Sequence, residues 1–237
     1  MKKKIIAAVI LIVSVCVCLF SGYKIFVIKR EYSAAENMYF QQEKAVVNEN
    51  EKGEKAFDFE KLKTTNKDIC GWIEIPAIKV SYPVLQGENN NSYLRRLPDG
   101  TYNVGGSIFV DERCRNDFTS PVTVIYGHFM YNGSMFGRLK SFLNKDFLNN
   151  NRELKIYTPD KTIYLQILAC FEVNKKSAIY NLPENEITDE YIETLSQASD
   201  TELNEIDKEN EKIVLLSTCS HSFESARTVL AAKYKCR

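Results

Sequence analysis

The sequence predicts a mostly β domain, either a barrel or a sandwich of about eight short strands with few helices. Three observations support this prediction. From residue 69 onward, short runs rich in β-branched and aromatic residues alternate with Pro, Gly and Asn clusters. The chain has 237 residues, 44% hydrophobic and 26% charged, which is an ordinary globular composition and enough for one domain of about 200 residues. The long apolar run lies at the N-terminus, apart from these strands.

The N-terminal run predicts a membrane anchor. Three lysines precede residues 5–23, nineteen residues without a charge, which is close to the roughly 20 that span a bilayer as a helix. A cleaved signal peptide would have a shorter apolar run and an A-x-A-like site, which residues 18–22 match poorly. Three basic residues lie on each flank, and the α-amino group favours a cytoplasmic N-terminus with the remaining domain outside. We therefore expect residues 1–30 to form a cytoplasmic tip and a transmembrane anchor.

Residues 31–67 are expected to form a helical segment between the anchor and the β domain. Residues 33–50 are rich in Ala, Glu, Gln and Met and predict a helix, which Gly53 ends. Residues 57–62, with the sequence FDFEKL, predict a second short helix. The β domain then covers residues 68–237.

Within residues 68–237 the pattern predicts strands separated by two helices. The predicted strands cover residues 69–75, 80–85, 107–110, 122–126, 154–157, 162–173, 212–217 and 227–235. Residues 134–143 predict a helix with Ser134 as its N-cap. Residues 188–199 predict a further helix, because their apolar side chains recur at helical spacing.

Charge and composition disfavour or exclude several classes of function. The 31 basic and 31 acidic residues cancel, but residues 1–30 hold six basic residues and no acid, so the rest of the chain carries a net charge of −6. Nucleic-acid binding is disfavoured, because phosphate binding needs a positive surface. Two histidines cannot build a multi-histidine zinc site or an HExxH metalloprotease, and none of the seven cysteines forms a CxxC pair. Cys70, Cys114 and Cys170 are expected to be small core residues.

Three side chains of complementary chemistry lie at predicted strand ends. One strand runs into Gly127 and His128, another runs into Cys219, and Arg227 opens the next. A thiolate attacks a carbonyl carbon, and an imidazole moves protons near neutral pH. A guanidinium can only donate hydrogen bonds, for example to an oxyanion. Each residue also has a simpler interpretation, as a core thiol, a surface imidazole and a strand-capping guanidinium.

His221 is a second candidate base, because it lies two residues after Cys219. Side chains two apart on one strand share a face at about 7 Å. His221 falls in a Ser-rich turn, however, where side chains tend to point to solvent. We therefore choose His128, which ends a strand of its own.

At these residues the sequence resembles the sortases, the cysteine transpeptidases of Gram-positive surfaces. The sortase signature is T-L-x-T-C followed by Arg several residues later, with an upstream His. Residues 215–219 read LLSTC, so Leu215 replaces the first Thr, and His128 and Arg227 stand in the expected order. L,D-transpeptidases carry Arg two residues after the Cys, where this chain has His221. The segments that further resemble class B are residues 66–76, 80–87, 91–94 and 126–137.

The resemblance implies an eight-stranded sortase-type β-barrel with N-terminal helices and a helix inserted between late strands. It implies that a C-terminal sorting signal, NPxTN-like or LPxTG-like, is cleaved through a thioester on Cys219 and that the acyl group passes to a peptidoglycan amine. His128 would be the general acid, and Arg227 would hold the oxyanion or the substrate backbone. The residues implied to line the signal-peptide groove are Leu94, Tyr180, Ser217 and Thr218. No cofactor and no metal are expected.

Two alternatives stay open. A pilus-type sortase would polymerise pilins through a pilin lysine and often carries a lid before the barrel, whereas residues 31–68 predict helices and no obvious lid. A membrane-anchored binding module with an inert barrel would keep its activity in a Cys219→Ala variant, and a transpeptidase would lose it.

Overall fold

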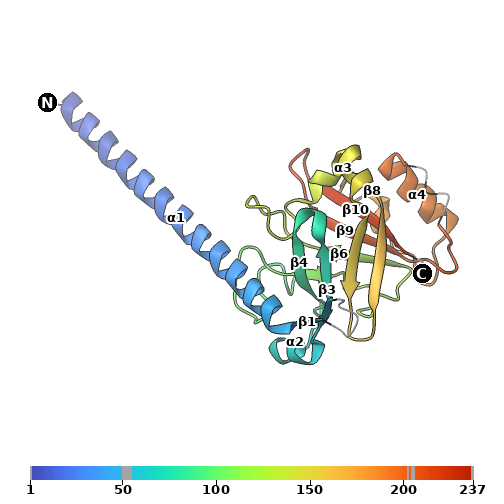
Figure 1. Ribbon diagram of the computed structural model, residues 1–237. Coiled ribbons are helices and arrows are strands. Elements are labelled where there is room, and N and C mark those ends of the chain that lie inside the picture. The colour runs from blue at the N-terminus through green and yellow to red at the C-terminus, as the bar shows by residue number, and fades with distance from the viewer. Residues whose placement is uncertain (1, 50–54, 202, 204–205, 236–237) are drawn as a thin grey trace.

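The computed structural model describes residues 2–49, 55–201, 203 and 206–235, and its centre is a closed barrel of eight strands (Figure 1). Around the barrel the strands follow the order β10-β8-β7-β3-β4-β5-β6-β9. Their bounds are β3 (Ile69–Ile75), β4 (Val80–Leu85), β5 (Ile108–Val110), β6 (Val122–Tyr126), β7 (Glu153–Tyr157), β8 (Thr162–Asn174), β9 (Ile213–Cys219) and β10 (Ala226–Tyr234). The predicted eight-stranded barrel is confirmed, and the sandwich is excluded.

A single helix, α1 (Lys2–Val46), holds both the apolar N-terminal run and most of the helix predicted for residues 33–50. Its first part extends away from the barrel, and its last part packs on the barrel through Ala35, Tyr39 and Val46 (Figure 1). The predicted helix is too long at its end, because β1 (Val47–Glu49) pairs there with β2 (Lys55–Phe57). Gly53 lies outside the described residues.

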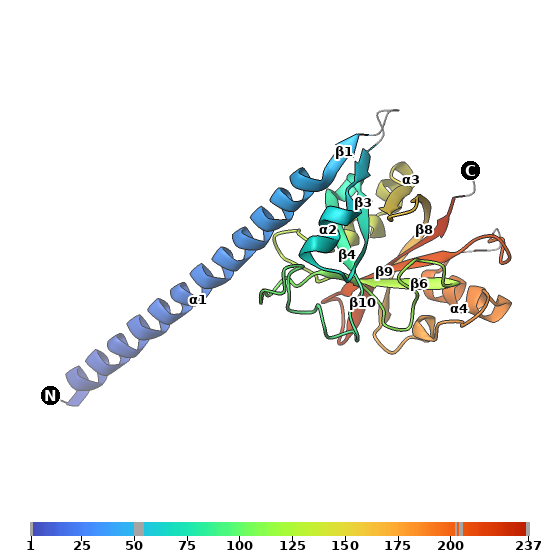
Figure 2. The ribbon, with the colours of Figure 1, turned by 90° about the horizontal axis from the view of Figure 1, so that it is seen from below.

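Six short helices lie around the barrel in the described part of the chain. Three are α-helices, α2 (Phe59–Thr65), α3 (Lys145–Asn150) and α4 (Asp189–Ser199), and three are 3₁₀ helices, η1 (Pro76–Ile78), η2 (Leu139–Leu143) and η3 (Ala178–Tyr180). Asp58 caps α2 by accepting a hydrogen bond from the Lys61 amide, so this helix starts two residues later than predicted. Thr188 caps α4, which lies between β8 and β9 as expected and on the side of the barrel away from α1 (Figure 2).

Three apolar clusters lie in the described part of the chain, and one of them packs α2 and Val46 of α1 against β3, β4, β5 and β7. The barrel interior contains completely buried residues such as Ile75, Ile125 and Leu216. Another cluster lies between α4 and the outer face of β6, β9 and β10, and Leu195 and Leu215 are buried in it. Leu215, which replaces the threonine of the sortase signature, therefore packs beneath the inserted helix.

The helix predicted for residues 134–143 is wrong. The chain forms turns up to Arg138, and only the 3₁₀ helix η2 (Leu139–Leu143) follows. Met135 has a φ of 51°, and a Cβ at Gly137 would lie 2.2 Å from the Met130 carbonyl oxygen, so the chain folds back on itself here. Ser134 caps no helix, and its hydroxyl instead donates to Asn132.

Candidate active site

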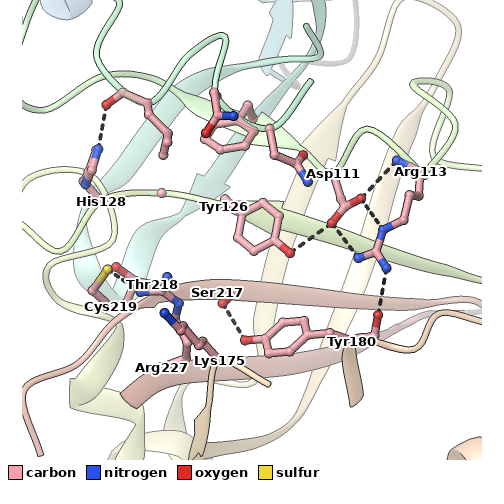
Figure 3. Close-up of a pocket in the computed structure, with 15 residues that line it drawn as sticks. Asp111, Arg113, Tyr126, His128, Lys175, Tyr180, Ser217, Thr218, Cys219 and Arg227 are labelled. Atoms are coloured by element: carbon pink, nitrogen blue, oxygen red, sulfur yellow. Dashed lines mark hydrogen bonds and ion pairs between the residues drawn. The ribbon is translucent and has the colours of Figure 1, made fainter. Parts of the chain in front are cut away.

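A cavity of about 400 Å³ opens where β6 and β9 end (Figure 3). Its walls come from these two strands, from β10, from the loop before β5 and from the segment around η3. The seven residues predicted from the sequence all line it: Leu94, His128, Tyr180, Ser217, Thr218, Cys219 and Arg227.

Strand register brings three of these residues together from distant parts of the sequence. β6 and β9 run parallel with Tyr126 beside Ser217, and the Gly127 amide donates to the Ser217 carbonyl at 3.2 Å. Both strands therefore end at the same end of the barrel, where His128 lies just after β6 and Cys219 is the last residue of β9. β9 and β10 run antiparallel with Cys219 directly opposite Arg227.

Arg227 contacts the thiol directly. Its Nη1 donates a hydrogen bond to Sγ of Cys219. A guanidinium keeps its charge at any physiological pH, so Arg227 can only donate hydrogen bonds here. The N–H groups that do not face sulfur can bind an oxyanion that forms on a carbonyl attacked by Cys219.

His128 is held as a neutral imidazole. Its Nε2 lies 2.6 Å from the Leu94 carbonyl oxygen, which can only accept, so this nitrogen carries the proton and Nδ1 is left as an acceptor. Burial, together with the cations Arg95 and Arg227, holds the His128 pKa below its usual 6.5 despite that hydrogen bond. A Cβ at Gly127 would lie 2.6 Å from the Phe136 ring, so the residue before His128 must be glycine for the strand to leave in this direction.

A second group of polar residues occupies the other end of the cavity (Figure 3). Asp111 is completely buried and forms an ion pair with Arg113, in which Nη2 of Arg113 lies 2.8 Å from Oδ2 of Asp111. The Tyr126 hydroxyl donates to the same carboxylate at 2.9 Å. Arg113 also donates to the Tyr180 carbonyl at 3.0 Å, and the Tyr180 hydroxyl hydrogen-bonds to Ser217 at 2.8 Å. This Asp111–Arg113 network joins four separate segments of the chain.

Thr218 lines the cavity, and its hydroxyl is buried with no hydrogen-bond partner among the described residues. An unpartnered buried hydroxyl costs about 1–3 kcal/mol.

His221 does not line the cavity. It is exposed in the β9–β10 turn, as predicted, but its ring stacks on Tyr131 with centroids 5.7 Å apart and planes 4° apart. Its Nε2 lies 3.2 Å from the Tyr131 hydroxyl. The stack links the turn after Cys219 to the loop after His128.

Three other cysteines of the β domain point into the fold and do not line the cavity. Burial raises the pKa of the Cys70 and Cys170 thiols to about 12 and also raises the pKa of Cys114. All three thiols donate to backbone carbonyl groups inside the fold. They are therefore packing residues, as predicted, whereas Cys236 lies outside the described residues.

Some lining residues were not singled out from the sequence. They are Asn90, Phe109, Asp111, Arg113 and Lys175. Asp111 and Arg113 come directly after a predicted strand, and charged side chains at a strand end are the signal that could have found them. Lys175 lies in a polar stretch with no pattern of its own. Across the part of the chain that the structure describes, no group of three or more His, Cys, Asp or Glu residues could hold a metal ion.

Comparison with known proteins agrees with this geometry. Residues 73–235 match the model of the sortase domain family. The chain is 31% identical over 225 residues to sortase B of Listeria monocytogenes, covering 92% of each chain, and 26% identical over 240 residues to sortase B of Staphylococcus aureus, covering 98% of each. A solved structure of sortase B from B. anthracis superposes with a TM-score of 0.72 at 27% identity, covering 89% of this chain and all of that one. A Staphylococcus aureus sortase B–substrate complex superposes with a TM-score of 0.64 at 27% identity, covering 75% of this chain and 84% of that one.

Proposed function

We propose a mechanism for this chain, which belongs to class B of the sortase family and is a cysteine transpeptidase that acts in surface-protein sorting. In the proposal Cys219 is the nucleophile, His128 moves the protons and Arg227 binds the oxyanion. The observation that carries it is the convergence of these three residues at one end of one cavity, which follows from the register of β6, β9 and β10.

The proposed reaction has two halves. Sγ of Cys219 attacks the carbonyl carbon of the scissile bond, and the thiol proton passes to the ring nitrogen of His128 that the Leu94 hydrogen bond leaves free. Arg227 stabilises the oxyanion, the C–N bond breaks, and the leaving amine takes the proton from His128. An acceptor amine then attacks the thioester carbonyl and gives a proton to His128, the C–S bond breaks, and His128 passes this proton to Sγ of Cys219, which restores the starting thiol and the neutral imidazole.

The low pKa of His128 suits this role. An imidazolium whose pKa lies below 6.5 is a stronger acid than an ordinary one, so it gives its proton readily to the leaving amine. The neutral ring is the form that can accept the thiol proton, and it predominates at pH 7 for the same reason.

The proposed substrates are two peptides. The first is a C-terminal sorting signal, NPxTN-like or LPxTG-like, which would lie along Leu94, Tyr180, Ser217 and Thr218 and be cut after its Thr. The second is an amine of peptidoglycan, in a precursor stem or cross-bridge. Solved structures of Staphylococcus aureus sortase B with a substrate and of sortase B complexed with triglycine support a peptide and an amine as partners.

We further propose a single-pass membrane location with the N-terminus in the cytoplasm and the catalytic domain outside. Helix α1 is long and apolar enough to cross a bilayer, and its apolar side chains are exposed. In this proposal residues 1–30 form the tip and anchor and residues 68–237 the catalytic barrel. Residues 31–67 form the segment between them, which is not wholly helical as predicted, because it contains the β1–β2 pair beside the end of α1 and helix α2.

One observation keeps a second function in view. A Streptococcus pyogenes class B sortase described as involved in pilus biogenesis superposes with a TM-score of 0.68 at 27% identity, covering 75% of this chain. Polymerisation of pilins would use a pilin lysine as the acceptor in place of a peptidoglycan amine. The acceptor therefore separates the two functions.

Peptide turnover tests the proposal. A chain that begins at Glu31 would be incubated with a panel of quenched signal peptides, alone and with either a peptidoglycan-derived amine or a lysine-bearing pilin. We expect cleavage after Thr and transfer to the peptidoglycan amine. Cys219→Ala should abolish both, and Cys170→Ala, which removes a packing thiol, should retain them. Failure of both this chain and the full-length chain to cleave any panel peptide would overturn the proposal, and transfer to the pilin alone would favour the second function.

A further inference from the structure

The Asp111 carboxylate is completely buried and is hydrogen-bonded on both of its oxygens. The Asp111 carboxylate accepts four: from Nε and Nη2 of Arg113 at 2.9 and 2.8 Å, from the Arg113 amide at 3.0 Å, and from the Tyr126 hydroxyl at 2.9 Å. A buried charge is stable only when it is paired and hydrogen-bonded in this way. Replacing the pair by apolar residues would often be neutral or stabilising for a fold, so the network calls for a functional explanation.

Arg113 acts on one wall of the cavity. Its Nη1 donates to the Tyr180 carbonyl, which lies in the connection between β8 and α4. The Tyr180 hydroxyl is tied to Ser217 of β9 at 2.8 Å. Tyr180 is thus held at both ends, by Arg113 at its backbone and by Ser217 at its hydroxyl, and its ring is fixed along the cavity (Figure 3).

Asp111 acts on the facing wall. Tyr126 is the last residue of β6, and its hydroxyl donates to the Asp111 carboxylate. Its ring packs on the Phe109 ring, with the two ring centroids 5.5 Å apart. One ion pair therefore sets the orientation of two tyrosine rings that come from different elements of the fold. The hydrogen bonds of the two charged residues go to this network and not to Cys219 or His128, which bond to Arg227 and Leu94.

The Asp111–Arg113 network and the nucleophile Cys219 line the same cavity at opposite ends. Ser217 precedes Cys219 by two residues on β9, which is about 7 Å of strand, and Tyr180 extends the path by the length of its side chain. The proposed function places the sorting signal along Tyr180 and Ser217, so the residues on the acyl side of the scissile bond would meet the two tyrosines.

We propose that Arg113 and Asp111 are positioning residues that set the affinity for the acyl side of the sorting signal by fixing Tyr180 and Tyr126. This inference rests on the proposed function. It separates peptide binding, which needs the network, from the thiol chemistry, which does not.

The test uses Arg113→Lys, which keeps the positive charge beside Asp111 but loses the planar fork that bonds Asp111 and Tyr180 together. The matched control is Arg115→Lys, because Arg115 is exposed on the same loop and does not line the cavity. We expect Arg113→Lys to raise KM for the best panel peptide at least about tenfold with kcat changed less than about threefold. Arg115→Lys should change neither.

Two further readouts exclude a merely structural role. The rate at which iodoacetamide alkylates Cys219 should stay within about twofold of the parent chain, because that small reagent does not need the tyrosine walls. Peptide affinity, measured in a Cys219→Ala background, should fall about tenfold with Arg113→Lys. In a chain that also carries Tyr180→Ala, adding Arg113→Lys should lower the affinity much less, because the two substitutions remove the same cavity wall.

The outcomes are distinct. An unchanged KM in an active Arg113→Lys variant, fully additive effects of Arg113→Lys and Tyr180→Ala, or a parallel loss of alkylation rate would overturn this inference alone. A parent chain that turns over no panel peptide would overturn the proposed function and the inference with it.

Discussion

A chain that begins at Glu31 should fold and turn over peptide, whereas a chain that begins at Val47 should be much less stable. The described side chains of residues 2–30 are not buried, so removing them takes no packing from the barrel. Residues 31–46 are different: the Tyr39 hydroxyl donates to the Gly106 carbonyl at 2.9 Å, and Glu43 accepts from Ser81 at 2.7 Å.

The size of the loss follows from the burial of three side chains. Ala35, Tyr39 and Val46 are 7%, 5% and 3% exposed. Burying the two large ones contributes about 1.5–3 kcal/mol each and the alanine methyl about 0.8 kcal/mol. After the discount for a compact unfolded chain, about 3–5 kcal/mol remains. At about 2–4 °C per kcal/mol for a domain of this size, the melting temperature should fall by about 6–20 °C.

Thermal unfolding followed by circular dichroism measures this difference, with peptide turnover as the second readout. Equal melting temperatures for the two chains would refute the assignment of residues 31–46 to the folded domain. A chain from Glu31 that is soluble and folded but inactive would show instead that the anchor belongs to the active enzyme.

Other predictions concern the thiols and histidines. Iodoacetamide at pH 8 should alkylate Cys219 but not Cys70 or Cys170, because burial raises the pKa of these two thiols to about 12. An adduct on Cys70 or Cys170 in mass spectrometry would contradict their assignment as packing residues. His128→Ala should lower peptide turnover by about 2–4 orders of magnitude and His221→Ala by less than about tenfold; the reverse ranking would exchange their roles. In an NMR titration the His128 midpoint should fall below pH 6.5, because burial lowers its pKa. Since the unfolded chain then binds this proton more readily, the free energy of unfolding should decrease as pH falls through 6.5, and no such decrease would contradict that pKa.

Much of the barrel could be predicted because its strands carry their own signals. β3, β4 and β6 have the predicted bounds, since each is a run of β-branched and aromatic residues between turn-forming residues. The helix prediction for residues 134–143 failed although their apolar spacing fits a helix. In the folded chain Gly137 approaches the Met130 carbonyl closely, and this tertiary contact excludes a helix there. Propensity reports local preference and is overridden where the chain packs on itself.

The site was predictable to the extent that its residues lie in a recognisable motif. Cys219, Arg227 and His128 could be named because a thiol, a guanidinium and an imidazole at strand ends match one known order along a chain. Asp111 and Arg113 have no such motif, and their importance arises from Tyr126 and Tyr180, which only the closed barrel and the η3 segment bring to them. Contacts of this kind depend on tertiary structure and leave no periodic trace in the sequence.

If residues 1–30 form the proposed anchor, the unbroken helix α1 would hold the barrel at a fixed height above the bilayer. Only six residues lie between Ile28, the last of the apolar stretch, and Ala35, the first that is buried against the barrel. The seven steps from Ile28 to Ala35, at a rise of 1.5 Å each, span about 10 Å. With the apolar part in a bilayer, this rigid stalk would hold the barrel at the level of the lipid headgroups, without the reach of a flexible tether. Substrates that are themselves still attached to lipid or emerging from the membrane would come within range, and finished wall material tens of ångströms away would not.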